Sequence, residues 1–201
     1  MAVTAQLQSF RRRLLDGLAE SIVEIGYRNT TVADVVRRAR TSRRTFYEHF
    51  ASKEECFIEL LRDANAEMIR EISAAVDPGA QWMTQIQQAI EAWIACAESR
   101  PGIVVCWIRD VPAIGDAGRD LQREMMAAFV TMVQTLSKTG EWRAIRPDGV
   151  SRQLTILLLG GLRELIATTV EEGGRASDIT EVAVQATIAL LAPPGALSLR
   201  P

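Results

Sequence analysis

Residues 31–50 read TVADVVRRARTSRRTFYEHF, and this stretch carries the strongest signal in the sequence for both fold and function. It predicts two short helices joined by a tight turn. The second helix opens with Ser42-Arg43-Arg44-Thr45 and also carries Tyr47 and His49. A helix of this kind enters the major groove of DNA with its N-terminal residues toward the base edges. The stretch is therefore typical of a DNA-binding helix-turn-helix.

Residues 8–57 resemble the DNA-binding domain of the TetR family of bacterial transcription regulators. One position departs from the family pattern, because Arg40 stands in the turn where the family usually has Gly. A left-handed turn residue costs more for Arg than for Gly, so we expect either mild strain at Arg40 or a slightly different turn. The matching residues are Gly26, Tyr27, Thr30, Thr31, Val32, Val35, Ala39, Ser42, Thr45, Phe46, Tyr47, Phe50, Lys53 and Glu54.

Charge is unevenly divided along the 201 residues, of which 48% are hydrophobic, a content that favours folding over disorder. Residues 1–54 hold ten Lys/Arg and six Asp/Glu, a net charge of +4. Residues 55–201 hold thirteen and nineteen, a net charge of −6. A basic first quarter fits a nucleic-acid-binding head, and the acidic remainder fits a body that binds a neutral ligand or a second copy. Chance is the alternative for an imbalance of this size.

Apolar residues recur at three- and four-residue spacing and no alternating strand pattern is present, so the sequence predicts an all-α protein of about nine helices. The family resemblance implies the same layout. We expect a helix-turn-helix DNA-binding head of three helices over residues 1–54, a ligand-binding and dimerisation body over 55–192, and a flexible tail over 193–201. In the body, residues 140–149 are expected to form a loop between two helices.

The helix that opens at Ser42 is expected to contact DNA. Arg43 and Arg44 lie in its first turn, and arginine is the commonest side chain that reads guanine through two hydrogen bonds. The alternative is that such residues are ordinary solvated polar side chains. The full set of expected DNA-contacting residues is Thr31, Arg43, Arg44, Thr45, Tyr47, His49 and Lys53.

The resemblance implies roles for the other members of that set. Tyr47 and His49 would contact phosphate or base. Thr31 and Lys53 match family positions that hold the DNA backbone at two helix N-termini, where amide groups and the helix dipole favour phosphate. For His49 a core position is equally consistent with the sequence, because helical spacing places it beside two phenylalanines.

No catalytic set is recognisable, so the sequence predicts a protein that is not an enzyme and needs neither cofactor nor metal. The single histidine lies in the DNA-binding head, and the three cysteines match no zinc-binding spacing. We expect reduced, partly buried thiols in a cytoplasmic protein. The N-terminus lacks a signal-peptide pattern, and the apolar run 154–162 is shorter than the ~20 residues that span a bilayer, so no membrane partner is expected.

Large, soft side chains concentrate in the body, between about residues 82 and 132. A family regulator usually senses a small molecule between these helices, and Met and aromatic side chains suit an adaptable apolar pocket of a few hundred Å³. Plain core packing is the alternative for each residue. Arg109 and Glu98 are candidates for a polar anchor, although surface exposure is favoured for both. The expected pocket residues are Trp82, Trp93, Trp107, Met125 and Phe129.

The last two expected helices have apolar sides wider than one partner helix needs. Gly160 and Gly161 weaken a lone helix. Close approach of another helix backbone would explain why glycines occupy these positions. Two copies would then form a four-helix bundle; burial within one chain is the alternative. The expected dimer residues are Leu154, Leu158, Gly161, Leu162, Leu165, Val182, Ala186 and Ala189.

These patterns, together with what the family resemblance implies, indicate a homodimeric, ligand-responsive transcription regulator, with a repressor favoured. Its expected partners are an operator in double-stranded DNA, a second copy of the chain and a small-molecule effector. Two alternatives stay open. One is a DNA-binding protein that responds to no ligand, and the other is an enzyme or small-molecule carrier with a vestigial DNA-binding head.

Overall fold

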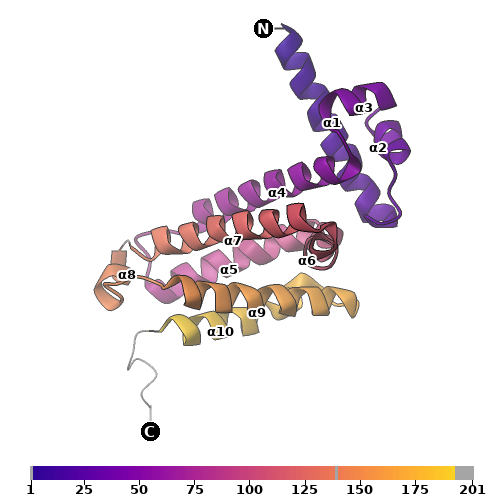
Figure 1. Ribbon diagram of the computed structural model, residues 1–201. Helices are drawn as coiled ribbons and strands as arrows, with labels where there is room; N and C mark the ends of the chain where they lie inside the picture. Colours follow the sequence, from indigo (N-terminus) through magenta and orange to yellow (C-terminus); the bar gives the residue numbers. More distant parts are fainter. Residues whose placement is uncertain (1, 139, 193–201) are drawn as a thin grey trace. The chain divides into compact units, whose positions relative to one another are not determined.

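The computed structural model describes the backbone of residues 2–138 and 140–192 and the side chains from residue 9 onward within these ranges (Figure 1). All regular structure in these ranges is helical, which confirms the all-α prediction. The expected tail over 193–201 lies outside the described residues. The helices are α1 (Ala2–Ile25), α2 (Val32–Arg38), α3 (Arg43–His49), α4 (Lys53–Ala75), α5 (Trp82–Ser99), α6 (Pro101–Arg109), η1 (Val111–Ile114), α7 (Asp116–Leu136), α8 (Gly140–Ile145), α9 (Arg152–Glu171), η2 (Ala176–Ile179) and α10 (Thr180–Leu191).

Helix α8 lies where the sequence predicted a loop, so the described residues contain ten α-helices rather than nine. Turn residues at both ends of this segment suggested a loop. However, Trp142 on α8 is only 4% exposed and packs edge-on against Trp82, with 5.4 Å between ring centroids. The backbone N–H of Trp82 also donates to the Glu141 carboxylate at 2.7 Å. Tertiary contacts thus stabilise a helix too short to be recognised from its own sequence.

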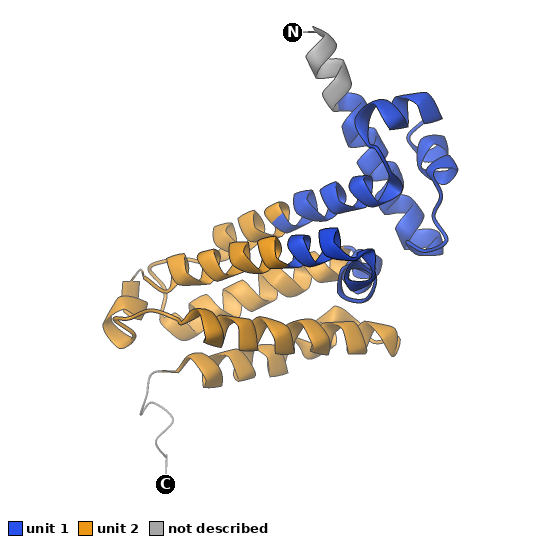
Figure 2. Cartoon of the chain, viewed as in Figure 1, with its two compact units in different colours: residues 1–65, 100–122 blue, residues 66–99, 123–201 orange. Residues whose placement is uncertain are grey.

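The chain divides into two compact units (Figure 2). The first comprises residues 1–65 and 100–122, and the second comprises residues 66–99 and 123–201. Helices α4 and α7 each contribute residues to both units. The sequence predicted a boundary after residue 54 between a DNA-binding head and a ligand-binding body. That boundary concerns function, and it stays a prediction.

In the first unit, α1 packs on α2, α3 and α6. Its buried face carries Leu14, Leu18 and Ile22, which recur at four-residue spacing and are at most 2% exposed. Gly17 on the same helix permits close approach of α2, because a Cβ there would lie 2.8 Å from the carbonyl oxygen of Val35. The three-helix head is therefore tightly packed around α1.

Polar side chains cap the N-termini of α2, α3 and α4. Thr31 and Asp34 form a complete capping box on α2, and the Ser42 hydroxyl accepts from the backbone N–H of Thr45 on α3. At α4 the Ser52 hydroxyl accepts from the N–H of Glu55, whereas the Glu55 carboxylate accepts from the N–H of Ala51. These bonds fix where α2, α3 and α4 start.

In the second unit, α5 packs on α10, and α9 also packs on α10. At the end of α5, the Glu98 carboxylate accepts from Arg175 Nε at 2.8 Å and from the N–H of Ser177 at 3.0 Å, which lowers the Glu98 pKa. Among the described residues, α9 is the one helix whose length and apolar composition would suit a membrane span. Of its apolar 18-residue stretch, 28% is buried.

Candidate functional site

Helix α3 presents a basic and aromatic face to solvent. Arg43, Arg44 and Tyr47 are exposed, with 59% of Tyr47 accessible. Arg44 Nε donates to the Glu48 carboxylate at 3.0 Å, one turn along the helix. The Arg44 side chain is nevertheless 90% exposed, and an exposed pair of this type contributes little stability. A DNA phosphate or base could therefore replace Glu48 as the partner of Arg44 at small cost.

The opposite face of α3 is anchored in the head. Phe46 is fully buried and Phe50, which ends the helix, is 2% exposed. Their ring centroids are 5.7 Å apart, and the Arg11 guanidinium lies 5.7 Å from the Phe50 ring. Because one face is fixed by aromatic packing, the exposed arginines project from a rigid support.

Arg40 adopts the left-handed conformation, with φ at 49°, which matches the first of the two alternatives that the sequence left open, mild strain rather than a different turn. The Arg13 side chain from α1 donates to the carbonyl oxygens of Ala39 at 2.5 Å and Arg40 at 2.7 Å. These charge-assisted bonds hold the α2–α3 turn in place and offset the conformational cost at Arg40. The sequence analysis missed Arg13, because nothing local to it indicates a partner 26 residues away.

Of the residues expected at the DNA, Lys53 and Thr31 have hydrogen-bond partners within the chain, and His49 is partly buried. The Lys53 ammonium donates to the carbonyl oxygens of Tyr27 at 3.1 Å and Thr30 at 2.9 Å, and lies 4.3 Å from the Tyr27 ring centroid. Thr31 is exposed, but its hydroxyl is engaged in the capping box. The Nε2 atom of His49 is buried without a hydrogen-bond partner. This arrangement favours the core interpretation of His49, and it gives Lys53 a role in positioning α4 against the α1–α2 loop.

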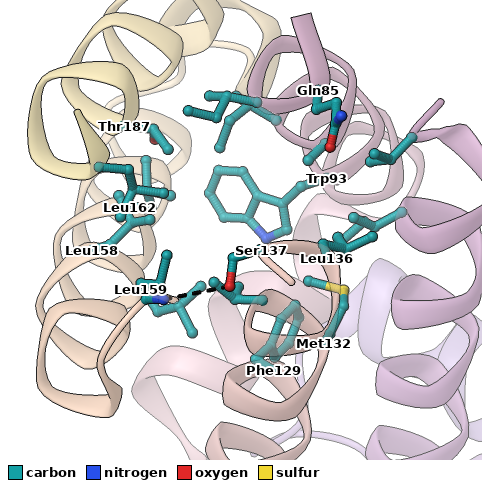
Figure 3. A pocket seen from close by; sticks show the side chains of 18 of the residues that line it. Gln85, Trp93, Phe129, Met132, Leu136, Ser137, Leu158, Leu159, Leu162 and Thr187 are labelled. Carbon is teal, nitrogen blue, oxygen red and sulfur yellow. Dashed lines mark hydrogen bonds between the residues drawn. The ribbon is translucent and has the colours of Figure 1, made fainter. Parts of the chain in front are cut away.

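An apolar cavity of about 90 Å³ lies within the second unit (Figure 3). It is smaller than the few hundred Å³ expected from the sequence, because large side chains such as Trp93 and Met132 extend into it. No charged side chain lines it. The lining residues are Ile72, Val76, Gln85, Ile86, Ala89, Ile90, Trp93, Phe129, Met132, Val133, Leu136, Ser137, Trp142, Val150, Leu158, Leu159, Leu162, Thr187 and Leu191.

Of the five expected pocket residues, Trp93 and Phe129 line this cavity. Trp82 does not, because it packs against Trp142 instead. Met125 is buried elsewhere on α7, and Trp107 belongs to the first unit. Trp82, Met125 and Trp107 therefore do not line this cavity. A side chain of suitable type lines a cavity only if it lies on the face of its helix that borders the cavity.

Polar groups are few in the cavity lining, and most are engaged. The Thr187 hydroxyl donates to the carbonyl of Ala183 at 2.6 Å. The Ser137 hydroxyl donates to the carbonyl of Gln134 and accepts from the N–H of Val150. Gln85 is 3% exposed and its Nε2 donates to the carbonyl of Ala80 at 2.8 Å, whereas its Oε1 has no partner. The two anchors considered from sequence do not line the cavity: Glu98 pairs with Arg175, and Arg109 lies on α6.

The expected dimer residues divide between two faces. Leu158 and Leu162 are 6% exposed and line the cavity, so their side chains are covered within the single chain. The exposed side of α9 carries Leu157, 62% accessible, with Gly160 and Gly161, whose missing side chains would meet nothing within 4 Å. Leu154 and Leu165 are half-buried, whereas Val182, Ala186 and Ala189 are exposed on α10. Small and apolar residues of both helices thus stay uncovered in the single chain.

The surroundings of the three cysteines favour the protonated thiol over the thiolate. Burial raises the pKa of Cys56 to about 12 and that of Cys106 to about 11. Burial and a hydrogen bond to Glu71 raise the pKa of Cys96 to about 12. Among the described residues no cluster of three or more His, Cys, Asp or Glu is arranged to hold a metal ion.

Comparison with known proteins identifies the family of the N-terminal head. Residues 14–60 match the family described as bacterial regulatory proteins, tetR family, and this range includes the whole of α2 and α3. The head is a TetR-family DNA-binding domain. That finding confirms the resemblance drawn from residues 8–57.

Curated relatives match only part of the chain. The HTH-type transcriptional repressor KstR2 of Mycobacterium tuberculosis is 45% identical over 60 residues, which are 30% of either protein. The uncharacterized HTH-type transcriptional regulator YxbF of Bacillus subtilis is 27% identical over 94 residues, 47% of this chain and 24% of YxbF. The matched segments therefore span less than a third of these relatives.

Solved structures match over nearly the whole chain, at low identity. The fatty acid degradation regulator FadR from Bacillus halodurans superposes with a TM-score of 0.77 at 15% identity, covering 94% of this chain and 97% of that one. FadR from Bacillus subtilis, solved in complex with stearoyl-CoA, gives a TM-score of 0.75 at 15% identity, covering 90% and 97%. This likeness establishes the shared fold of head and body.

Proposed function

We propose that this chain is a homodimeric transcriptional repressor that binds an operator in double-stranded DNA and leaves it when a small, neutral, largely apolar ligand occupies the cavity. The observation that carries the proposal is the exposed face of α3, where Arg43, Arg44 and Tyr47 project from a helix anchored by Phe46. Such a face suits base reading and phosphate binding in the major groove. The likeness of the head to the repressor KstR2 favours repression.

The uncovered surface of α9 and α10 supports the proposed dimer. Leu157 and Val182 are 62% and 51% exposed, and Gly160 and Gly161 leave room for close approach of another backbone. A second copy would cover these residues with its own α9 and α10. Two heads in successive major grooves would then read half-sites about 34–36 Å apart. An unpaired α9 face of this kind would be unusual on a soluble monomer.

For a ligand to release the protein from its operator, the ligand must bind one protein conformation more tightly than the other. Helices α4 and α7 line the cavity and also contribute residues to the unit that contains the head. A ligand that binds better to a conformation unfit for the operator shifts the population away from DNA. The same coupling lowers ligand affinity when DNA is bound. The cavity lacks charged residues, so the part of an effector that enters it would be uncharged.

Fluorescence anisotropy tests the proposal with DNA fragments recovered by genomic footprinting. We expect saturable binding to a palindromic sequence and a steep loss of affinity as salt rises, because phosphate contacts release counterions. The complex should contain two copies of the chain by sedimentation. Failure to prefer any footprinted fragment over random DNA would contradict the proposal and favour a carrier or enzyme with a vestigial head.

Effector screening separates a ligand-responsive repressor from a ligand-independent DNA-binding protein. Stearoyl-CoA is a natural first compound, because Bacillus subtilis FadR was solved with it. The observed cavity of about 90 Å³ favours smaller molecules unless its lining moves. A true effector should raise the melting temperature and release the operator over the same concentration range. A compound that binds the cavity and leaves operator affinity unchanged would support ligand-independent regulation.

A further inference from the structure

Gln85 Oε1 is the one fully buried polar side-chain atom of the cavity lining that has no hydrogen-bond partner among the described residues. The Gln85 side chain is 3% exposed, and no described group donates to Oε1. Figure 3 shows the amide among the lining side chains, near Trp93. A buried acceptor without a donor is costly, and native proteins rarely keep one without a reason.

The orientation of the Gln85 amide is determined by its neighbours. Nε2 donates to the carbonyl oxygen of Ala80 at 2.8 Å and faces that of Pro78 at 3.4 Å. Carbonyl oxygens accept and do not donate, so an amide turned the other way would bring oxygen against oxygen. The –NH₂ group is therefore held by the chain before α5, and Oε1 is left to accept.

The rest of the lining restricts what could satisfy Oε1. The hydroxyls of Thr187 and Ser137 already donate to backbone carbonyls of their own helices. The other lining residues are apolar apart from the indole N–H of Trp93 and Trp142. A cationic donor would lose its hydration with no carboxylate to replace it. The group that satisfies Oε1 must therefore donate a hydrogen bond and carry no charge. A neutral O–H or N–H on an otherwise apolar molecule meets both requirements.

We infer that Gln85 Oε1 is the anchor of the ligand site and selects neutral, largely apolar molecules that carry a hydroxyl or N–H donor. This inference rests on the proposed ligand-sensing function and makes it more specific. Discrimination of this kind is strong, because a molecule without the donor leaves Oε1 buried and unpaired in the complex as well.

Calorimetry with p-cresol and p-xylene tests the inference on the full chain, because these probes have the same shape and differ by one hydroxyl. We expect p-cresol to bind about five- to fiftyfold more tightly than p-xylene. Gln85→Met removes the acceptor at similar length and should abolish the preference. Thr187→Val is the matched control: it removes a lining hydroxyl that is already satisfied and should keep the preference.

A measurement on the unmutated chain covers the case in which Gln85→Met unfolds. The ¹³C chemical shift of the Gln85 side-chain carbonyl should move downfield when p-cresol is added and stay in place with p-xylene. Equal affinity for the two probes, binding of neither at millimolar concentration, or an unmoved Gln85 carbonyl would each overturn the inference. A chain that binds p-cresol through Gln85 but binds no DNA would contradict the proposed function and uphold this inference.

Discussion

The guanidinium group of Arg13 donates to the backbone carbonyl of Arg40 at 2.7 Å, across the turn between α2 and α3. Arg40 has a φ of 49°, a conformation that glycine adopts at less cost. The Arg13 side chain from α1 therefore stabilises this turn. A glycine at position 40 would have lowered the conformational cost of the turn without a distant partner. The orientation of α3 depends on this long-range contact.

Arg13→Ala should lower the free energy of unfolding by about 1.5–3 kcal/mol, because two backbone carbonyls lose a charged donor. Denaturant unfolding followed by circular dichroism measures this loss. Arg12→Ala is the control, since Arg12 forms only an exposed pair with Asp16 at 3.1 Å and should change stability by less than about 1 kcal/mol. Equal losses in both variants would refute the role of Arg13 in the turn.

Arg43→Ala should weaken operator binding by about 1–3 kcal/mol and relax base preference at one position of each half-site. Competition binding with single-base operator variants measures both effects. The matched control is Arg119→Ala, which removes an exposed arginine paired with Asp116 at the start of α7. An Arg43 variant with unchanged affinity and preference would exclude α3 as the reading helix.

Lys53→Met should destabilise the head by roughly 1–3 kcal/mol, because the Lys53 ammonium donates to the carbonyls of Tyr27 and Thr30. Thermal unfolding without DNA measures the effect. The sequence alone predicted a phosphate contact, whose loss would leave stability unchanged and flatten the salt dependence of DNA binding. A fully stable variant with a flatter salt dependence would favour that earlier interpretation.

Gly161→Leu should convert the proposed dimer to monomer. The added side chain meets nothing within 4 Å inside the chain, so it would clash only with a second copy. Sedimentation measures the oligomeric state. Gly17→Ala is the contrasting variant, because a Cβ there lies 2.8 Å from Val35 O and should destabilise the head without affecting assembly. A well-folded monomer for the unmutated chain at micromolar concentration would contradict the dimer.

Cys56 should resist alkylation by iodoacetamide while the chain is folded. Its pKa is raised by burial from 9.0 to about 12, so the thiolate fraction at pH 8 falls from roughly one in ten to roughly one in ten thousand. Reactivity should increase only as the pH rises toward 12 or the chain unfolds. Mass spectrometry after timed labelling in native buffer and in denaturant measures the difference. Rapid native labelling at pH 8 would be inconsistent with this burial.

The sequence by itself determined the elements that depend on neighbours along the chain. Capping by Thr31 and Ser42 fixed the starts of α2 and α3, and apolar spacing fixed which residues share a helical face. Arg44 is exposed and Phe46 is buried, as expected for residues two apart on a helix, which lie on nearly opposite faces. These features are local, so a residue pattern is sufficient to predict them.

Only the tertiary structure decided which face meets which neighbour. Leu158 and Leu157 are adjacent on α9, yet one lines the cavity and the other stays 62% exposed. Gln85 became a candidate anchor only because the carbonyl of Ala80 orients its amide beside apolar residues from α4, α7, α9 and α10. Helical periodicity defines the faces of a helix, but the packing of separate helices assigns each face to core, cavity or partner.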